Sequence, residues 1–508
     1  MTVNREKREM SFKRLSVAVA VGSLLSTAAC QTDLTALNQN PNNPTTAPAS
    51  ALFTGATVAT MQRFSGAGTT LSMTSLFAQH IAEVQYVEED RGHIRPTTID
   101  AIFSGPYTGE LEDYQKVALQ AEAAKVQAIS GPARVMQSWV FQNLTDLFGD
   151  IPYSEALKGD IVGSPLKPAY DAQKDVYYGM LKTLTDASAS MKLARAADAG
   201  LGSADPIYAG DLTKWIKFSN SLRARMAMRI LKADPAKAAT ELTAAFAGGV
   251  LASNADNAQL SWPGDGVYDN QWAANFATRD DHRVSKTLLD TMNALADPRI
   301  PIYAQPTKAD PTKYVGLQNG MDNITVTPFF NTTSRPGTIF YPGATSYGTF
   351  GSAAGKQTPF YVMTYAEVSF LQAEAAERGL GGLTGAAAYY NAGVTASILQ
   401  WGGTAAQAAA YLAQPGVAYV AGATGLKQIG LQKWIGLFTQ GNEAWSEWRR
   451  TGNPASIQPG PKMYSDVPGV PRRLTYSGAE QSVNKSSLDA AVARQGADTY
   501  LTRIWWDK

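Results

Sequence analysis

The chain has 508 residues, enough for about three average domains or one large helical one. Its 44 Lys and Arg against 43 Asp and Glu leave no basic excess for binding phosphates, so nucleic acid is not an expected partner. One cysteine and three histidines exclude a disulfide framework and any multi-cysteine metal site, and they leave little room for a histidine-rich one.

Residues 1–29 have the organisation of a secretory signal peptide. Five basic residues lie within residues 1–14, and the apolar run from Leu15 to Ala29 follows them. That run of about 15 residues is too short for a transmembrane helix, which needs roughly 20. The only cysteine, Cys30, comes next in an arrangement that resembles a bacterial lipobox, although Thr27 stands where leucine is usual. We therefore expect Cys30 to be lipidated; the alternative is an ordinary signal peptide followed by an unrelated cysteine.

The stretch after the signal peptide is rich in Asn, Pro and Thr. Residues 31–50 read QTDLTALNQNPNNPTTAPAS, a composition typical of extended chain. We expect residues 30–50 to form a flexible lead between a lipid anchor and a single domain at residues 51–508. No other segment is long and apolar enough to span a bilayer, so the body is expected to be soluble and held at the membrane by its lipid.

Helical periodicity dominates the rest of the chain. Pro132 is a candidate first residue of one helix, Asp211 or Thr213 caps another, and Thr364 with Glu367 forms a capping box. Paired helices of this length suit a mostly α, tetratricopeptide-like scaffold. The predicted helices are Ala133–Leu147, Ala172–Leu193, Thr213–Leu231, Tyr365–Arg378, Ala386–Trp401, Leu426–Phe438 and Leu488–Arg494.

The helix at 213–231 carries basic residues on one face. We expect its arginines to pair with acidic side chains of other segments rather than to bind a ligand. The arginines are Arg223, Arg225 and Arg229, and candidate partners are Glu367, Glu374 and Glu377.

Two long segments break the helical pattern. Residues 254–282 and 301–362 hold many aromatic residues among Gly, Pro, Asn and Asp, with a few short strands expected at Ile324–Thr327 and Thr338–Tyr341. Irregular loops of this length are unusual in a helical body, and long loops on a rigid scaffold commonly carry function.

These loops contain the candidate ligand-binding residues. Trp and Tyr present flat apolar faces with a polar edge, which suits the apolar faces of sugar rings. The alternative is that the aromatic side chains only pin the loops onto the helices. The candidates are Trp262, Tyr268, Trp272, Tyr341 and Tyr347, with Asp265, Asp269, Asn270 and Arg279 as partners for hydroxyl groups.

No pattern points to catalysis or to a cofactor. The acidic run Glu88–Asp90 and the pair Asp280–Asp281 are neighbours in sequence, so they do not face each other across a bond and are expected to be solvated. The string ATSYG at 344–348 lacks the strand–turn–helix setting of a nucleophile elbow. We expect no catalytic residue and no cofactor; calcium held by the loops is conceivable, but the spacing of Asp265 and Asp269 is not that of an EF-hand.

Several strings together resemble the SusD/RagB family of nutrient-binding outer-membrane lipoproteins. They extend from near the lipobox to the C-terminus, so the resemblance covers the mature chain. The strings are LNQNPNNPT (37–45), LFGDIPYSEAL (147–157), PAYDAQKDVYYGMLKTL (168–184), YAGDLTKWIKFSNSLRARMAMRI (208–230), DPRI (297–300), MTYAEVSFLQAEAAERG (363–379), LQKWIGLFTQGNEAWSEWRRTGNP (431–454) and TRIWWD (502–507).

This resemblance implies a function. Members of the family bind an oligosaccharide or peptide on the outer membrane and deliver it to a SusC-like TonB-dependent transporter, without cleaving it. The residues favour a glycan over a peptide but do not name the ligand. Two alternatives stay open: a lipid-anchored secreted hydrolase, and a structural lid of the transporter that binds no ligand.

Overall fold

The computed structural model describes residues 47–195, 198–337, 339–340 and 353–508. The predicted signal peptide, the predicted lipidation site Cys30 and most of the predicted lead lie outside these residues, as do Tyr341 and Tyr347. Two compact units divide the chain, Met1–Pro48 and Ala49–Lys508, and all elements named below belong to the second. In the described residues, no helix combines the length and the apolar character that crossing a membrane requires.

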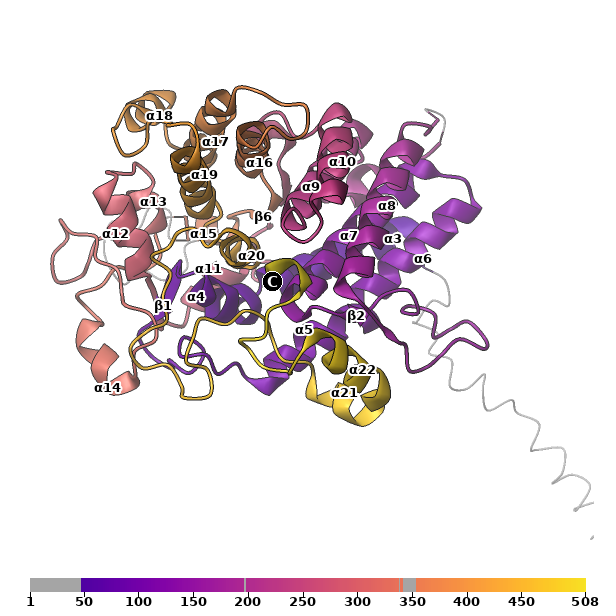
Figure 1. Cartoon of the computed structure of the whole chain (residues 1–508), viewed down its shortest axis with the longest axis horizontal. Helices are drawn as coiled ribbons and strands as arrows, with labels where there is room; N and C mark the ends of the chain where they lie inside the picture. The colour runs from indigo at the N-terminus through magenta and orange to yellow at the C-terminus, as the bar shows by residue number, and fades with distance from the viewer. Residues whose placement is uncertain (1–46, 196–197, 338, 341–352) are drawn as a thin grey trace, which may run out of the picture. The chain divides into compact units, whose positions relative to one another are not determined.

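The prediction of a mostly helical fold built on tetratricopeptide-like helix pairs is confirmed. In the first half of the domain, consecutive helices such as α6 and α7, or α8 and α9, pack against each other (Figure 1). The helices of this half are α3 Ala49–Ser65, α4 Ser75–Phe77, α5 Pro96–Thr108, α6 Glu110–Ala123, α7 Gln127–Phe148, α8 Gln173–Met191, α9 Leu212–Arg229 and α10 Pro235–Ala247, with a π-helix, η2, at Ala67–Thr74 and a 3-10 turn, η3, at Gly202–Ala204.

A second set of helices follows the irregular middle of the chain. Within it, α16 packs on α17 and on α19, and α20 packs on α4 and η2 of the first half (Figure 1). Its helices are α16 Tyr365–Glu377, α17 Ala386–Gln400, α18 Ala405–Leu412, α19 Ala423–Gly436, α20 Gly441–Thr451, α21 Gly478–Val483 and α22 Lys485–Gln495, and the chain ends in the 3-10 turn η6 Trp505–Asp507.

The middle segment contains only short elements, as the sequence predicts. Its elements are η4 Asn254–Asp256, β4 Ala258–Leu260, α11 Gln271–Phe276, β5 His282–Val284, α12 Lys286–Ala294, α13 Ile300–Tyr303, α14 Asn323–Val326, η5 Thr327–Phe329, α15 Ala353–Lys356 and β6 Phe360–Met363.

Strands occur as three antiparallel pairs. β1 (Ile81–Glu83) pairs with β5, β2 (Ile151–Pro152) with β3 (Tyr170–Asp171), and β4 with β6. In the first pair Glu83 lies opposite His282, so two segments about 200 residues apart meet at one point. This register brings acidic, basic and aromatic side chains from both segments to one place.

Two local predictions need correction. The strand expected at Ile324–Thr327 is wrong, because the Asp322 side chain accepts a hydrogen bond from the Thr325 amide and starts helix α14 instead. Pro132 does not begin its helix; α7 starts five residues earlier, at Gln127. The proline removes one backbone hydrogen bond, but Ala128, Ser130 and Gly131 of the preceding turn are buried and helical. In the other predicted strand, Ile339 and Phe340 form a turn, and Thr338 lies outside the described residues.

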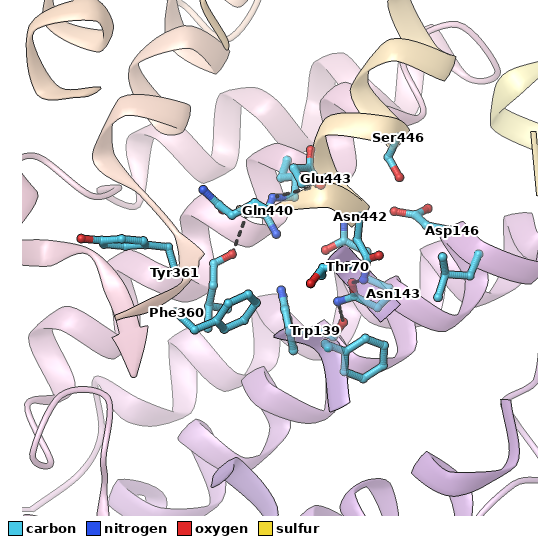
Figure 2. Close-up of a pocket in the computed structure, with 15 residues that line it drawn as sticks. Thr70, Trp139, Asn143, Asp146, Phe360, Tyr361, Gln440, Asn442, Glu443 and Ser446 are labelled. Atoms are coloured by element: carbon cyan, nitrogen blue, oxygen red, sulfur yellow. Dashed lines mark hydrogen bonds and ion pairs between the residues drawn. The ribbon is translucent and has the colours of Figure 1, made fainter. Parts of the chain in front are cut away.

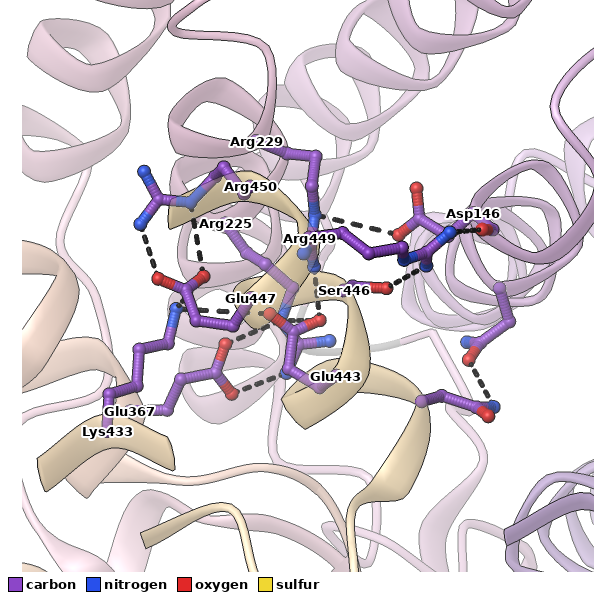
Figure 3. A network of polar contacts seen from close by, with 12 residues as sticks. Asp146, Arg225, Arg229, Glu367, Lys433, Glu443, Ser446, Glu447, Arg449 and Arg450 are labelled. Atoms are coloured by element: carbon purple, nitrogen blue, oxygen red, sulfur yellow. Dashed lines mark hydrogen bonds and ion pairs between the residues drawn. The ribbon is translucent and has the colours of Figure 1, made fainter. Parts of the chain in front are cut away.

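A buried network of ion pairs joins α9 to α16, α19 and α20 (Figure 3). Arg225 of α9 binds both oxygens of Glu367, at 2.6 and 2.7 Å, which confirms the predicted pairing of this arginine. Glu443 of α20 pairs with Arg229 and lies 3.6 Å from Arg225. The network continues through Lys433 to Glu447, at 3.0 Å. Arg223 and Arg229 pair with Glu241 and Glu443, not with the other two predicted acids.

Candidate functional site

Two of the predicted ligand-binding aromatics lie in the hydrophobic core. Trp262 and Trp272 are each 3% exposed. The Trp272 ring stacks on Phe340 with centroids 5.2 Å apart, and its Nε1 donates a hydrogen bond to Thr70 Oγ1 at 2.7 Å. Neither indole therefore presents a face to solvent in this conformation, and both attach the 254–282 segment to the helices.

The other described candidates shape the loop before α11. Tyr268 is 43% exposed. Asn270 caps α11 by accepting hydrogen bonds from the amides of Trp272 and Ala273, at 3.0 and 3.1 Å. Asp269 forms an ion pair with Lys356 at 2.8 Å. Of these three residues, only Tyr268 has a side chain that is free to meet a ligand.

A different concave site lies where β1 and β5 meet. We call it the Tyr86 pocket; its volume is about 200 Å³. It takes residues from η2, from the segment between β1 and α5, and from α11 and β5; β1 packs against β5, and η2 packs against α5 and α11. Its lining residues are Ala67, Gly68, Ser72, Glu83, Gln85, Tyr86, Glu89, Ile94, Arg95, Thr98, Asn275, Arg279, Asp281 and His282.

Tyr86 is the exposed aromatic side chain of this pocket. The residue is 55% exposed, and its backbone has a φ of 56°, in the left-handed region that a bulky residue rarely adopts. Such a conformation costs about 1–3 kcal/mol and tends to occur at functional sites. The Arg279 guanidinium lies 5.2 Å from the centre of the ring. The backbone and this cation–π contact together hold a large aromatic ring at the protein surface.

Two ion pairs stand at the mouth of the pocket. Arg279 pairs with Asp281, and Arg95 pairs with Glu89 at 2.8 Å. In both pairs the arginine side chain is exposed, at 47% and 63%, whereas each carboxylate is only 9% exposed. Of the predicted polar partners, Arg279 is thus the one that the structure places in a concave site.

The floor of the pocket consists of buried titratable groups. His282 Nε2 lies 3.1 Å from Ser72 Oγ and 3.7 Å from Glu83 Oε1. Burial, reinforced by the charges of Arg279 and Arg283, lowers the pKa of His282 to about 3, so the imidazole is neutral at pH 7. Burial, followed by repulsion from Asp90 and Glu89, raises the pKa of Glu83 well above its ordinary value.

The raised pKa of Glu83 gives a pH-dependent prediction. Because the folded-state pKa lies above the unfolded one, the contribution of Glu83 to stability is full below pH 4.5 and is lost as the pH rises through the folded pKa. Glu83→Gln mimics the protonated side chain. We expect this variant to gain stability relative to the wild type as the pH rises from mildly acidic to mildly basic. Thermal unfolding of both proteins across this pH range measures the difference in stability between them. A difference that does not change with pH would contradict the prediction.

An interior cavity near the ion-pair network is too small to hold a sugar. Its volume is about 30 Å³, room for roughly two water molecules. Figure 2 shows Asn442 beside Thr70 and Asn143, and Asn442 donates a hydrogen bond to Asn143 Oδ1 at 3.0 Å. Apolar side chains such as Phe64, Trp139 and Phe360 also line the cavity, so it is a small packing void in the core.

Neither the pocket nor the rest of the described chain offers an evident metal centre. Within residues 47–195, 198–337, 339–340 and 353–508, no three His, Cys, Asp or Glu side chains gather in a way that could hold a metal ion. Asp265 binds the amides of Val267 and Tyr268, at 2.9 and 2.8 Å. These hydrogen bonds form a turn.

The sequence analysis missed most of the Tyr86 pocket. Glu89 and Asp90, expected on a solvated face, are buried at 7% and 6% exposure, and Asp90 accepts a hydrogen bond from Asn319 at 2.7 Å. The composition of residues 82–93 indicates a polar loop site, since the segment combines Tyr, Arg and four acidic side chains without helical periodicity. The pairing of this segment with His282 could not be seen in the sequence.

Comparisons with known proteins point to one family. A family model described as starch-binding and associating with the outer membrane matches residues 41–477. A solved chitin-binding protein is 28% identical, with a TM-score of 0.78 over 91% of this chain and 100% of that one. A chitin-binding SusD homolog from Flavobacterium johnsoniae is 26% identical, with a TM-score of 0.75 over 90% and 98%. A SusD homolog from Bacteroides uniformis is 25% identical, with a TM-score of 0.76 over 90% and 99%. No curated protein matches the chain.

Proposed function

The chain belongs to the SusD-like family, and from this membership we propose that it binds a glycan in the Tyr86 pocket at the surface of the outer membrane. The match to the family model over residues 41–477 supports glycan binding and association with the outer membrane. Two similar structures carry titles that describe chitin-binding proteins, so oligomers of N-acetylglucosamine are the first ligands to test.

The exposed ring of Tyr86 is the observation that carries this proposal. One face of the ring is approached by Arg279, which leaves the other face for the apolar side of a sugar. Around it, Gln85, Asn275 and the two arginines offer hydrogen-bonding groups for hydroxyls. An aromatic platform with a few convergent polar groups in a concave site is typical of small-ligand recognition.

We propose that the bound glycan is passed intact to a SusC-like TonB-dependent transporter. Lipidation of Cys30 would keep the protein beside this partner, and the residues between Cys30 and the start of α3 at Ala49 would reach roughly 20–25 Å as a flexible chain. Glu89 and Asp281 are held in ion pairs with Arg95 and Arg279, which favours binding over hydrolysis. In this proposal the protein has no catalytic residue and needs no cofactor.

Replacing the aromatic platform tests the site. We expect Tyr86→Ala to weaken binding of a chitin oligomer by about 5- to 30-fold, which corresponds to the roughly 1–2 kcal/mol that an aromatic–sugar contact provides. Alanine keeps the Cβ atom and so does not give the backbone the added freedom of glycine, and we expect the pocket to stay formed. Isothermal titration calorimetry with the purified protein gives the affinity of each variant.

The matched control is a tyrosine far from the pocket in the fold. Tyr389 lies half-buried on α17, and Tyr389→Ala should leave glycan affinity within about twofold of the wild type. Equal affinities of the wild type and Tyr86→Ala would contradict the assignment of the site. Product release from the glycan would instead support the hydrolase alternative.

A further inference from the structure

We propose that Arg95 and Arg279 make the Tyr86 pocket selective for sugars with a neutral hydrogen-bond acceptor, such as an acetamido group, and exclude sugars with an amino group. This inference rests on the proposed function, because it concerns which glycans the same pocket accepts.

A ligand that enters the Tyr86 pocket meets its positive charges before its negative charges. The guanidinium side chains of Arg95 and Arg279 are 63% and 47% exposed, and the carboxylates that they pair with are 9% exposed. A ligand that enters the pocket therefore contacts the cations, and the acids lie behind them. Charge of the same sign as the nearer group is disfavoured, so an ammonium group on the sugar is repelled.

The arginine groups of the pocket that are still free to hydrogen-bond to a ligand are donors. Each arginine directs Nε towards its carboxylate, and its terminal Nη atoms have no hydrogen-bond acceptor among the residues that the structure describes, although the Arg279 guanidinium also lies against the Tyr86 ring. Asn275, which also lines the pocket, has a buried Nδ2 without a partner in the same residues. An arginine can only donate, so these groups call for an acceptor on the ligand, and a carbonyl oxygen supplies one.

The two ion pairs also make the pocket favour a neutral hydrogen-bond acceptor on the sugar over an anionic one. Each arginine already has a carboxylate partner, so a uronate would compete with Glu89 and Asp281 for the same guanidinium groups and would gain little from them. The neutral imidazole of His282 offers no further positive charge to a uronate. An acetamido carbonyl can use the free donors without bringing a negative charge close to Glu89 and Asp281. The pocket is therefore matched to N-acetylated sugars.

A set of four β-1,4-linked oligomers with the same gluco backbone tests this inference. They consist of N-acetylglucosamine, glucose, glucosamine or glucuronate. The first three differ only at C2, in an acetamido, hydroxyl or ammonium group, and the glucuronate oligomer differs from the glucose oligomer only in a carboxylate at C6. Calorimetry at mildly acidic pH, where the amino groups are charged, should give the N-acetylglucosamine oligomer the highest affinity. The glucosamine oligomer should bind at least about tenfold more weakly, by a gap that narrows as salt is added.

Two variants and one control assign the effect to residues. Arg279→Gln and Arg95→Gln remove the charge but keep an amide donor, and each should reduce the discrimination against glucosamine by about threefold or more. Arg195 is an exposed arginine that pairs with Asp198, outside the pocket, so Arg195→Gln should leave the discrimination unchanged. Because the readout is a ratio of affinities, a general loss of binding does not imitate it.

The outcomes distinguish this inference from the proposed function. If the glucosamine or glucuronate oligomer binds as tightly as the N-acetylglucosamine oligomer, or if the arginine variants keep the full discrimination, the inference is overturned while glycan binding stands. If no oligomer binds and a wider glycan panel gives no signal, the proposed function fails and the inference fails with it.

Discussion

Glu443→Gln should lower the free energy of unfolding by about 3–5 kcal/mol, because removing one partner of a buried ion pair leaves a desolvated charge behind. The Glu443 side chain pairs with Arg229 and lies 3.6 Å from Arg225 and 3.9 Å from Lys433, at the centre of the network in Figure 3. All three cations are at most 3% exposed. Urea-induced unfolding of the variant and the wild type measures the loss.

The pH dependence of this loss has a defined sign. Burial alone would raise the pKa of Glu443, but the charges of Arg229, Arg225 and Lys433 outweigh it and hold the pKa below its ordinary value of 4.5. The advantage of the wild type over Glu443→Gln is therefore full above pH 4.5 and shrinks as the pH falls through the folded pKa.

An exposed ion pair serves as the control for the buried one. Lys485 and Asp489 are 2.7 Å apart on α22 with side chains 62% and 57% exposed. Asp489→Asn should change the stability by less than about 0.5 kcal/mol. If Glu443→Gln changed the stability as little as this control does, the network would not be holding α9, α19 and α20 together.

Trp272→Ala should lower the free energy of unfolding by about 3–5 kcal/mol, the usual cost of removing a buried tryptophan side chain. The ring packs on Phe340, Phe276 and Phe438, and the truncation also leaves Thr70 Oγ1 without its indole donor. Trp272→Phe keeps most of the packing and should cost less. Urea-induced unfolding ranks the three proteins.

A neighbouring residue separates a packing role of Trp272 from a ligand role. Tyr268, four residues earlier, is 43% exposed, and Tyr268→Ala should leave the stability within about 0.5 kcal/mol of the wild type. If Trp272→Ala kept the wild-type stability but abolished glycan binding, Trp272 would be the ligand contact that the sequence predicts, and the packing role would be contradicted.

Much of the helical scaffold follows from local sequence. The observed bounds of α9, α16 and α17 lie within two residues of the predicted ones, because caps such as Asp211 and Thr364 act on their own turn. The error at α14 has the same origin, since the Asp322 cap outweighs the β-branched residues after it. Asp322 is an N-cap signal that the sequence itself carries.

The site was less predictable than the fold. Aromatic residues in the 254–282 loop suggested a ligand surface, but whether an indole faces the core or solvent depends on packing against Phe340 and Thr70, which lie far away in the chain. Likewise, the Tyr86 pocket exists only because β1 pairs with β5, with Glu83 opposite His282. Long-range pairing of this kind leaves no periodic trace in either segment.

The most direct test of the account is a crystal structure of the protein with a bound chitin oligomer. We expect a sugar ring to stack on the face of Tyr86 opposite Arg279, with an acetamido carbonyl within hydrogen-bonding distance of Arg95, Arg279 or Asn275. An oligomer bound elsewhere, for example against Tyr268 alone and away from the Tyr86 pocket, would contradict the central claim.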